Sequence, residues 1–248
     1  MSGRRVVYGV GPVTELIRKG AKEIDCLFVS EKRLTKKGDP VYEIAADAKN
    51  RSMSWTAVDN RELDRLAKGA PHQGVVAIAG AFAYRNIHDI VAKASKPGLL
   101  VALDGITDPH NLGAIMRSAL LLGADGLLLP KDRSAKVTAL VTKTSAGASE
   151  HLPIAQVTNL VRALEELKED GYWSVAVASG PKAVPLQSID SSMPLVVVLG
   201  SEGKGIRPLV GKVCDFHAEI PMAASAIGSF NVSVAAAITL YELTRTRA

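Results

Sequence analysis

The stretch Leu99-Leu-Val-Ala-Leu-Asp-Gly-Ile-Thr-Asp-Pro-His-Asn-Leu-Gly-Ala-Ile-Met-Arg117 carries the clearest fold signals in the sequence. It begins with five consecutive apolar residues, which is typical of a strand buried on both faces of a parallel sheet. Asp108-Pro109 then marks the start of a helix, with Asn111 in its first turn and Arg117 in its second. A strand followed directly by a helix indicates an α/β fold, in which ligands gather at the carboxyl ends of strands.

Similar apolar runs recur along the C-terminal two thirds of the chain, at Gly126–Leu129, Ile154–Val157, Ser174–Ala178 and Leu195–Leu199. Helical patterns separate or follow them, at residues 111–122, 137–149, 160–168 and 232–241. This alternation predicts a mostly parallel sheet covered by helices.

The first third of the chain contains shorter elements. Strand patterns at 25–30, 53–58 and 75–79 alternate with helical patterns at 12–19, 41–51 and 61–68, which predicts a small α/β/α unit. The pattern is lost after Gly80 and the gap ends in Lys96-Pro97-Gly98, a breaker sequence. We therefore expect an N-terminal domain at 1–79, a linker at 80–97 and a larger domain at 98–248.

Composition indicates a folded protein, because 47% of residues are hydrophobic and 22% are charged. No apolar run approaches the roughly 20 residues of a membrane-spanning helix, and Gly9, Gly11 and Pro12 interrupt any signal-peptide core. We expect a soluble, cytoplasmic protein without a membrane partner. Cys26 and Cys214 lie far apart without CxxC spacing, so we expect free thiols and no metal site.

The basic charge is concentrated at the N-terminal end. Residues 1–76 hold 14 Lys and Arg against 10 Asp and Glu, whereas residues 77–248 hold 16 against 15. Such an asymmetry fits an RNA-contacting module beside a catalytic one, and it equally fits an ordinary solvated surface.

The common nucleotide-binding fingerprints are absent. Gly9-x-Gly11 and Gly203-x-Gly205 both lack the third glycine of GxGxxG. Gly203-Lys204 lacks the Ser or Thr that should follow in a P-loop, and no glycine stands five positions before Lys204. There is also no GxSxG and no HExxH. A metabolic enzyme that uses a common nucleotide is therefore disfavoured.

Three segments carry polar residues at predicted strand-to-helix junctions. They are Leu103–Arg117, Leu195–Gly205 with Glu202, and Ile220–Asn231 with Ser229, the last leading into a helix of small residues. Taken singly, each has a purely structural explanation: Asn111, Ser229 and Asn231 could cap helices, and the glycine-rich segment could be a tight turn.

Together, in this order, the three segments resemble the signature motifs of the SpoU (TrmH-type) class of the SPOUT RNA 2'-O-methyltransferase superfamily. Within it the chain is most similar to bacterial 23S rRNA guanosine-2'-O-methyltransferases, whose pattern Lys131-Asp-Arg-Ser-Ala135 also matches. Tyr8–Val13 and His72–Val75 resemble the N-terminal substrate-binding domain of these proteins, which is similar to the ribosomal L30e/L7Ae fold.

The resemblance implies a C-terminal trefoil-knotted domain that binds S-adenosyl-L-methionine, in a homodimer with composite active sites. It implies RNA as the partner, 23S rRNA first, and excludes DNA because DNA lacks the 2'-hydroxyl. The implied catalytic residues are Asn111, Arg117, Glu202, Ser229 and Asn231. The implied cofactor-binding residues are Leu199, Gly200, Gly205, Ile220, Met222 and Phe230.

The third segment departs from the family pattern. Ala224 replaces a usual glycine, Phe230 replaces a usual leucine, and one residue fewer separates Met222 from Ser229. The resemblance therefore predicts a cofactor-side loop of altered shape.

The implied reaction needs two substrates in line and stabilisation of an alkoxide, because a ribose hydroxyl is hardly ionised near pH 7. Arg117 is the family's usual general base, but a guanidinium stays protonated in proteins, so a fork that grips phosphate and alkoxide is an alternative. In that scheme Asn111 and Glu202 orient Arg117 and the ribose, while Ser229 and Asn231 fix the loop beneath. Methylation of tRNA, methylation of an antibiotic-resistance site in rRNA and a non-catalytic RNA-binding assembly factor remain alternatives.

Overall fold

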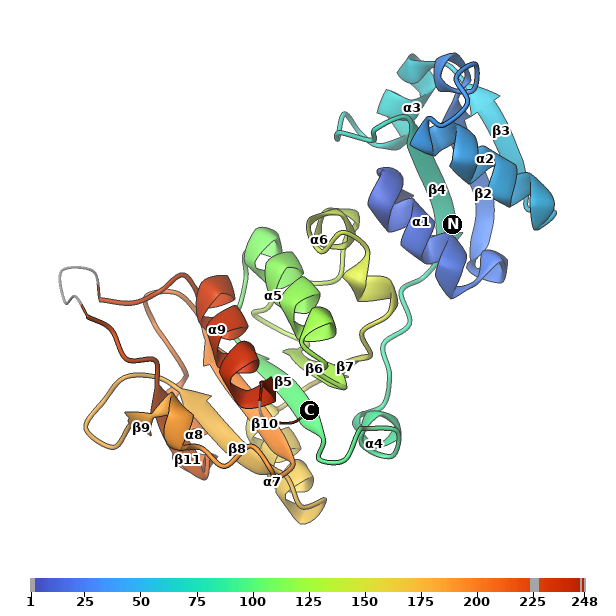
Figure 1. Ribbon diagram of the computed structural model, residues 1–248. Helices are drawn as coiled ribbons and strands as arrows, with labels where there is room; N and C mark the ends of the chain where they lie inside the picture. Colours follow the sequence, from blue (N-terminus) through green and yellow to red (C-terminus); the bar gives the residue numbers. More distant parts are fainter. Residues whose placement is uncertain (1–2, 224–227, 246, 248) are drawn as a thin grey trace. The chain divides into compact units, whose positions relative to one another are not determined.

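The computed structural model describes residues 3–223, 228–245 and 247 (Figure 1). The chain forms two compact units. Unit 1 comprises Met1–Ala83 and Val137–His151, and unit 2 comprises Tyr84–Lys136 and Leu152–Ala248. Residues 137–151 therefore pack with the N-terminal segment, although in the sequence they lie inside the expected domain 98–248.

Unit 1 contains a four-stranded sheet in the order β1-β4-β2-β3. Its strands are β1 (Arg4–Tyr8), β2 (Ile24–Ser30), β3 (Trp55–Val58) and β4 (Val75–Gly80). β4 is antiparallel to both of its neighbours, and β2 pairs with β3 in parallel.

Helices cover both faces of this sheet. Helices α1 (Val10–Lys19) and α2 (Pro40–Asn50) pack with Val75 and Ala77 of β4, whereas Leu63 of α3 (Asn60–Leu66) packs with Val76 on the other face. Because successive strand residues point to opposite faces, both alternate sets of β4 are buried. The α/β/α unit expected from the sequence is confirmed.

Residues 137–149 form a shorter helix than their pattern predicts. Helix α6 covers Ala139–Thr144, and a 3-10 turn follows at Ala148–Glu150. Between them Ala146 and Gly147 have φ angles of 53° and 90°. This left-handed pair cannot continue an α-helix, so the helix ends before it.

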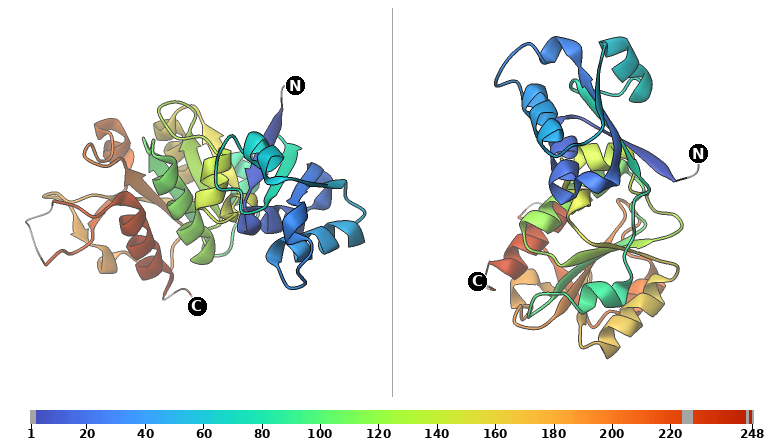
Figure 2. Two further views of the ribbon diagram at one scale, coloured as in Figure 1. Left: turned by 90° about the horizontal axis from the view of Figure 1, so that it is seen from above. Right: turned by 90° about the vertical axis from the view of Figure 1, so that its right-hand side faces the viewer.

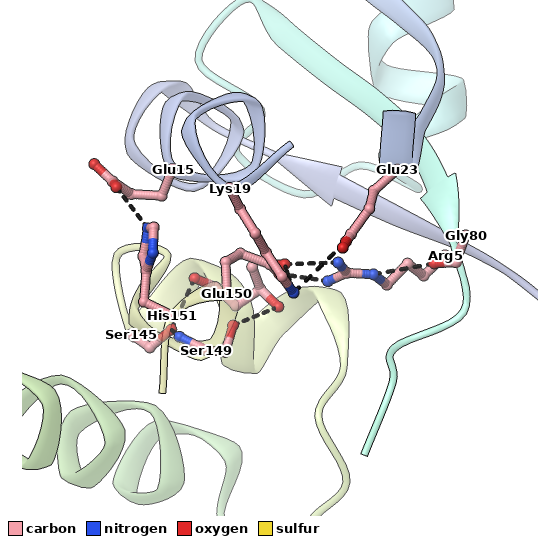
Figure 3. Close-up of polar contacts among 10 residues, drawn as sticks. Arg5, Glu15, Lys19, Glu23, Gly80, Ser145, Ser149, Glu150 and His151 are labelled. Carbon is pink, nitrogen blue, oxygen red and sulfur yellow. Dashed lines mark hydrogen bonds and ion pairs between the residues drawn. The ribbon is translucent and has the colours of Figure 1, made fainter. Parts of the chain in front are cut away.

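A fully buried carboxylate joins this segment to the rest of unit 1 (Figure 3). The two Glu150 oxygens accept hydrogen bonds from Arg5 Nη1 and Nη2 at 2.5 and 2.7 Å, and Lys19 Nζ lies 3.4 Å away. Next to it, His151 Nε2 lies 2.8 Å from Glu15 Oε2 of α1. A buried charge is tolerated only when it is paired in this way.

Unit 2 contains a seven-stranded sheet in the order β7-β6-β5-β10-β8-β11-β9, with every pairing parallel. Its strands are β5 (Leu99–Asp104), β6 (Gly126–Pro130), β7 (Ile154–Val157), β8 (Trp173–Val177), β9 (Val184–Pro185), β10 (Leu195–Gly200) and β11 (Phe216–Glu219). The predicted parallel sheet is confirmed. Its central strands β5 and β10 each begin with five consecutive apolar residues.

Two sets of helices cover the faces of this sheet (Figures 1 and 2). Helices α5 (Pro109–Leu121) and α9 (Val232–Thr244) lie side by side on one face. Helices α4 (Ile87–Val91), α7 (Leu160–Glu169) and α8 (Pro208–Val213) contribute to the core on the other. None of the helices in the described ranges is long and apolar enough to cross a membrane.

Two α-helices and two strands in the described part of unit 2 have no counterpart in the sequence prediction: α4, α8, β9 and β11. Helix α4 lies within the expected linker 80–97. All four have six residues or fewer, and β9 contains a proline. Segments this short complete too little of a period to be recognised.

Candidate active site

The loops that follow β5 and β10 meet at the carboxyl ends of the strands of the seven-stranded sheet. The two strands pair in parallel with Gly200 opposite Asp104, so both chains leave the sheet at the same level. After β5, Asp108 caps α5 by accepting a hydrogen bond from the His110 amide at 2.9 Å. This cap places Asn111 in the first turn of α5, next to the loop after β10.

Three of the predicted catalytic residues form one hydrogen-bonded cluster. Asn111 Nδ2 donates to Glu202 Oε1 at 3.3 Å, and Asn231 Nδ2 donates to Asn111 Oδ1 at 3.0 Å and also to Glu202 Oε1. Asn231 caps α9 as well, because its Oδ1 accepts from the Ser233 amide at 2.9 Å. Asn231 therefore caps α9 and at the same time belongs to the cluster.

The loop that carries Glu202 folds tightly on itself. Ser201 and Gly205 exchange two backbone hydrogen bonds of 3.1 and 2.8 Å. A Cβ atom on Gly200 would lie 2.1 Å from the carbonyl carbon of Gly205, so only glycine fits there. Gly205 itself has φ 65°, which glycine adopts without strain.

Asp104, which sequence reasoning did not select, fixes the far end of the same loop. Its carboxylate is fully buried and accepts from the Arg207 amide at 2.7 Å and from Arg207 Nε at 2.6 Å. A signal was present in the sequence, because a carboxylate directly after the buried run Leu99–Leu103 requires a partner. The position of Glu202 thus depends on a residue about a hundred positions earlier in the chain.

A cavity of about 500 Å³ opens beside the cluster. Its walls are the ends of β8, β10 and β11 with the segments that follow them, and residues near the start of α9. All six predicted cofactor-binding residues line it: Leu199, Gly200, Gly205, Ile220, Met222 and Phe230. Glu202, Ser229 and Glu219 line it too.

Arg117 lies apart from this cavity. It is exposed on α5, does not line the cavity, and has no hydrogen bond or ion pair with any of the described residues. One turn further along, Leu121 is 74% exposed. Within one chain, the structure brings together Asn111, Glu202 and Asn231, places Ser229 on the adjacent cavity, and leaves Arg117 outside the cluster.

The predicted change of loop shape can be followed only in part. Ala224 lies outside the described residues, which resume at Gly228. Phe230, by contrast, lines the cavity with 40% of its surface exposed.

Comparison with known families gives two matches that together span most of the chain. Residues 98–241 match the SpoU rRNA Methylase family, and residues 6–85 match the domain described as RNA 2'-O ribose methyltransferase substrate binding. These matches confirm the resemblance on which the sequence analysis relied.

Individual relatives agree over the full length. The chain is 40% identical over 250 residues to the 23S rRNA (guanosine-2'-O-)-methyltransferase RlmB of Pseudomonas aeruginosa, covering 100% of this chain and 98% of that protein. It is 39% identical over 244 residues to the putative TrmH family tRNA/rRNA methyltransferase YacO of Bacillus subtilis, covering 97% and 95%.

Solved structures share the fold. An AdoMet-bound rRNA methyltransferase from Sinorhizobium meliloti superposes with a TM-score of 0.79 at 25% identity, covering 98% of this chain and 87% of that one. The SpoU methyltransferase AviRb from Streptomyces viridochromogenes gives a TM-score of 0.82 at 24% identity, covering 99% and 91%.

Proposed function

This chain belongs to the SpoU rRNA methylase family, and we propose that it methylates the ribose 2'-oxygen of a guanosine in 23S rRNA with S-adenosyl-L-methionine. The single observation that carries the proposal is the cavity directly beside the Asn111, Glu202 and Asn231 cluster. The substrate follows from the full-length relative of Pseudomonas aeruginosa, whose name specifies a guanosine of 23S rRNA.

The cavity suits the proposed cofactor in size and chemistry. Its volume of about 500 Å³ lies within the ordinary range of small-molecule sites. Leu199, Ile220 and Phe230 offer apolar surface to a purine ring, and the carboxylates of Glu202 and Glu219 suit a positively charged ligand. When bound, S-adenosyl-L-methionine supplies an electrophilic methyl group.

The cluster beside the cavity would hold the acceptor. Glu202 Oε1 receives hydrogen bonds from both asparagine side chains, which fixes its carboxylate at the mouth of the cavity. The remaining acceptor oxygen and the Ser229 hydroxyl can then orient a ribose hydroxyl toward the donor. Such positioning is the main demand of an in-line methyl transfer.

Arg117 would complete the site from a second copy of the chain. Its guanidinium faces solvent without a partner among the described residues, and α5 and the neighbouring helix α9 carry exposed apolar side chains. These are Leu121, Val234 and Tyr241, exposed by 74%, 45% and 60%. We propose that they bury against a partner in a homodimer, which brings Arg117 to the phosphate and the developing alkoxide of the partner's site.

The proposal is tested by incubating the full chain with methyl-labelled S-adenosyl-L-methionine and unmodified 23S rRNA. Label at one 2'-oxygen, mapped by resistance of the adjoining phosphodiester to alkali, is the expected result. Transfer of label to tRNA alone, or to a known resistance site, would replace the substrate. Cofactor binding without label on any RNA would favour an assembly factor in the cytoplasm, where rRNA matures.

Arg117 offers the sharpest mutational control of the reaction. Arg117→Ala should lower kcat/KM by about 100- to 1,000-fold, because it removes a donor to the developing alkoxide. Arg117→Lys should recover little, since an ammonium cannot form the fork. Arg162→Ala, at an exposed arginine of α7, is the matched control and should stay near wild type.

A further inference from the structure

The loop that follows β6 lies next to the loop after β5. The Ala135 amide donates to the Ile106 carbonyl at 2.8 Å, and the Ser134 hydroxyl donates to the same oxygen at 3.3 Å. At its start, the Lys131 amide donates to the Val157 carbonyl at 2.8 Å. The backbone of residues 131–136 is therefore fixed at both ends, along the same sheet edge as the Asn111 cluster.

Three cationic side chains of this loop have no ionic or hydrogen-bonding partner among the residues that the structure describes. Lys131, Arg133 and Lys136 are exposed, and none of them forms an ion pair or a side-chain hydrogen bond with a residue in the described ranges. Asp132 is the only acidic residue among them, so the segment has a net charge of +2. Their side chains are free to meet a negatively charged partner.

Arg133 also adopts a backbone conformation that disfavours it. Its φ angle is 55°, in the left-handed region that glycine occupies most easily. The hydrogen bonds on either side hold this turn in place. Arginine therefore occupies a position whose backbone conformation favours glycine.

The order of features along the sheet edge indicates what that partner is. The cavity lies beyond β10 on the β8 side, the Asn111 and Glu202 cluster lies between β10 and β5, and the cationic loop follows β6 on the other side. Neighbouring strands are about 4.8 Å apart, so the end of β6 lies one strand spacing from the end of β5 and two from the end of β10, the strands whose loops carry the cluster. If the ribose of a nucleotide binds at the cluster with its 2'-oxygen toward the cavity, the adjoining phosphates of the strand would lie on the β6 side, next to the cationic loop.

We propose that Lys131, Arg133 and Lys136 bind the backbone phosphates of the RNA strand beside the nucleotide that is methylated. This inference rests on the proposed function and assigns it a phosphate-binding loop in unit 2, separate from the substrate-binding domain. Contacts of this kind fix the register of a nucleic acid without reading its bases, and they weaken as salt rises.

The test uses the full chain with the triple substitution Lys131→Ala, Arg133→Ala, Lys136→Ala. The matched control removes three cations that are also exposed but belong to other segments, Lys93→Ala, Lys96→Ala, Lys212→Ala, so the net charge of both variants is the same. KM for 23S rRNA should rise at least about tenfold in the loop variant only, with kcat and cofactor affinity unchanged. The slope of log affinity against log salt should fall by about 2, as expected for three cations on single-stranded RNA.

Arg133→Gly separates an RNA-binding role from a structural one. Glycine relieves the left-handed turn, so Tm should not fall. KM for RNA should nevertheless rise several-fold. A lowered Tm with an unchanged KM would mean that Arg133 serves the fold, and would overturn the proposal for this residue.

The two possible failures are distinguishable. If wild type methylates no RNA, the proposed function fails whatever the loop does. If wild type methylates 23S rRNA and the loop variant matches the control variant in KM and in salt slope, the phosphate-binding role is wrong. A fall in kcat at unchanged KM would also contradict it.

Discussion

Two fully buried carboxylates, one in each unit, are both bound by an arginine, yet they act on different parts of the molecule. Glu150 in unit 1 receives two hydrogen bonds from Arg5 and lies near Lys19, and it attaches residues 137–151 to the first β-strand. Asp104 in unit 2 receives the Arg207 amide and Nε, and it fixes the loop that carries Glu202.

The difference lies in what each ion pair holds. The Arg5 side chain is only 15% exposed, so the pair with Glu150 is enclosed by the structure it stabilises. Arg207 is 51% exposed and belongs to a loop at the candidate active site. Similar chemistry thus serves the packing of unit 1 and the geometry of a reaction site in unit 2, and substitutions should separate the two.

Among substitutions of these buried carboxylates, Asp104→Asn should have the largest effect on the reaction. The NH2 group of asparagine would face the N–H groups of Arg207, which now donate to the Asp104 carboxylate, so the loop would shift. A displacement of 1 Å in an active site costs on the order of 100-fold in kcat/KM. The free energy of unfolding should also fall by about 3 kcal/mol. Methylation kinetics and urea unfolding measure both, and near-normal kinetics would refute a positioning role for Asp104.

Glu150→Gln should cost a similar amount of stability with little effect on the reaction. Breaking a buried pair lowers the free energy of unfolding by about 3 to 5 kcal/mol, because an uncompensated charge remains. Cofactor affinity and kcat at saturating RNA should stay within about twofold, since no atom of this pair lines the cavity. Equal losses of kcat in the Glu150 and Asp104 variants would abolish the distinction.

A third carboxylate, Asp215, should give a smaller and pH-dependent effect. Burial alone would raise the pKa of Asp215, but hydrogen bonds from Lys168 and Ser174 outweigh it and hold this pKa below its ordinary value. Wild type should therefore be more stable than Asp215→Asn at pH 7, by about 1 to 2 kcal/mol. This advantage should vanish as the pH falls below about 4 and through the folded-state pKa, which urea unfolding at several pH values can follow.

The thiol of Cys214 reports on the same region with the smallest effect. Burial raises its pKa to about 11, and the nearby charges of Asp215 and Asp104 add to the rise. At pH 8 its alkylation by iodoacetamide should be about 100-fold slower in the folded than in the urea-unfolded protein, because so little thiolate is present. Peptide mass spectrometry gives both rates, and equal rates would show that the thiol is accessible and ionised.

The fold could be predicted where burial leaves a complete pattern. Leu99–Leu103 and Leu195–Leu199 are central strands covered on both faces, so every residue in them is apolar. The short strand Phe216–Glu219 alternates apolar and polar residues over only four positions, and the edge strand Val184–Pro185 is shorter still. These carry too little pattern, and they pair only because the sheet beside them already exists.

The site was less accessible to sequence reasoning than the fold. Asn111, Glu202 and Asn231 were selected through a family resemblance, since 91 residues separate the first two and 120 separate the outer pair. Asp104 and the cationic loop at 131–136 were not selected as site residues. The trefoil knot and the homodimer that the resemblance implies stay predictions.

The sequence by itself determined the α/β class, the apolar central strands and the capped start of α5, because these depend on residues close together in the chain. Only the tertiary structure decided that residues 137–151 pack with unit 1, that β10 lies beside β5, and that Asp104 fixes the Glu202 loop. Such contacts join residues far apart in the chain, because buried charges must be paired and strand edges must be hydrogen-bonded. Local sequence patterns do not show which distant residue provides the partner.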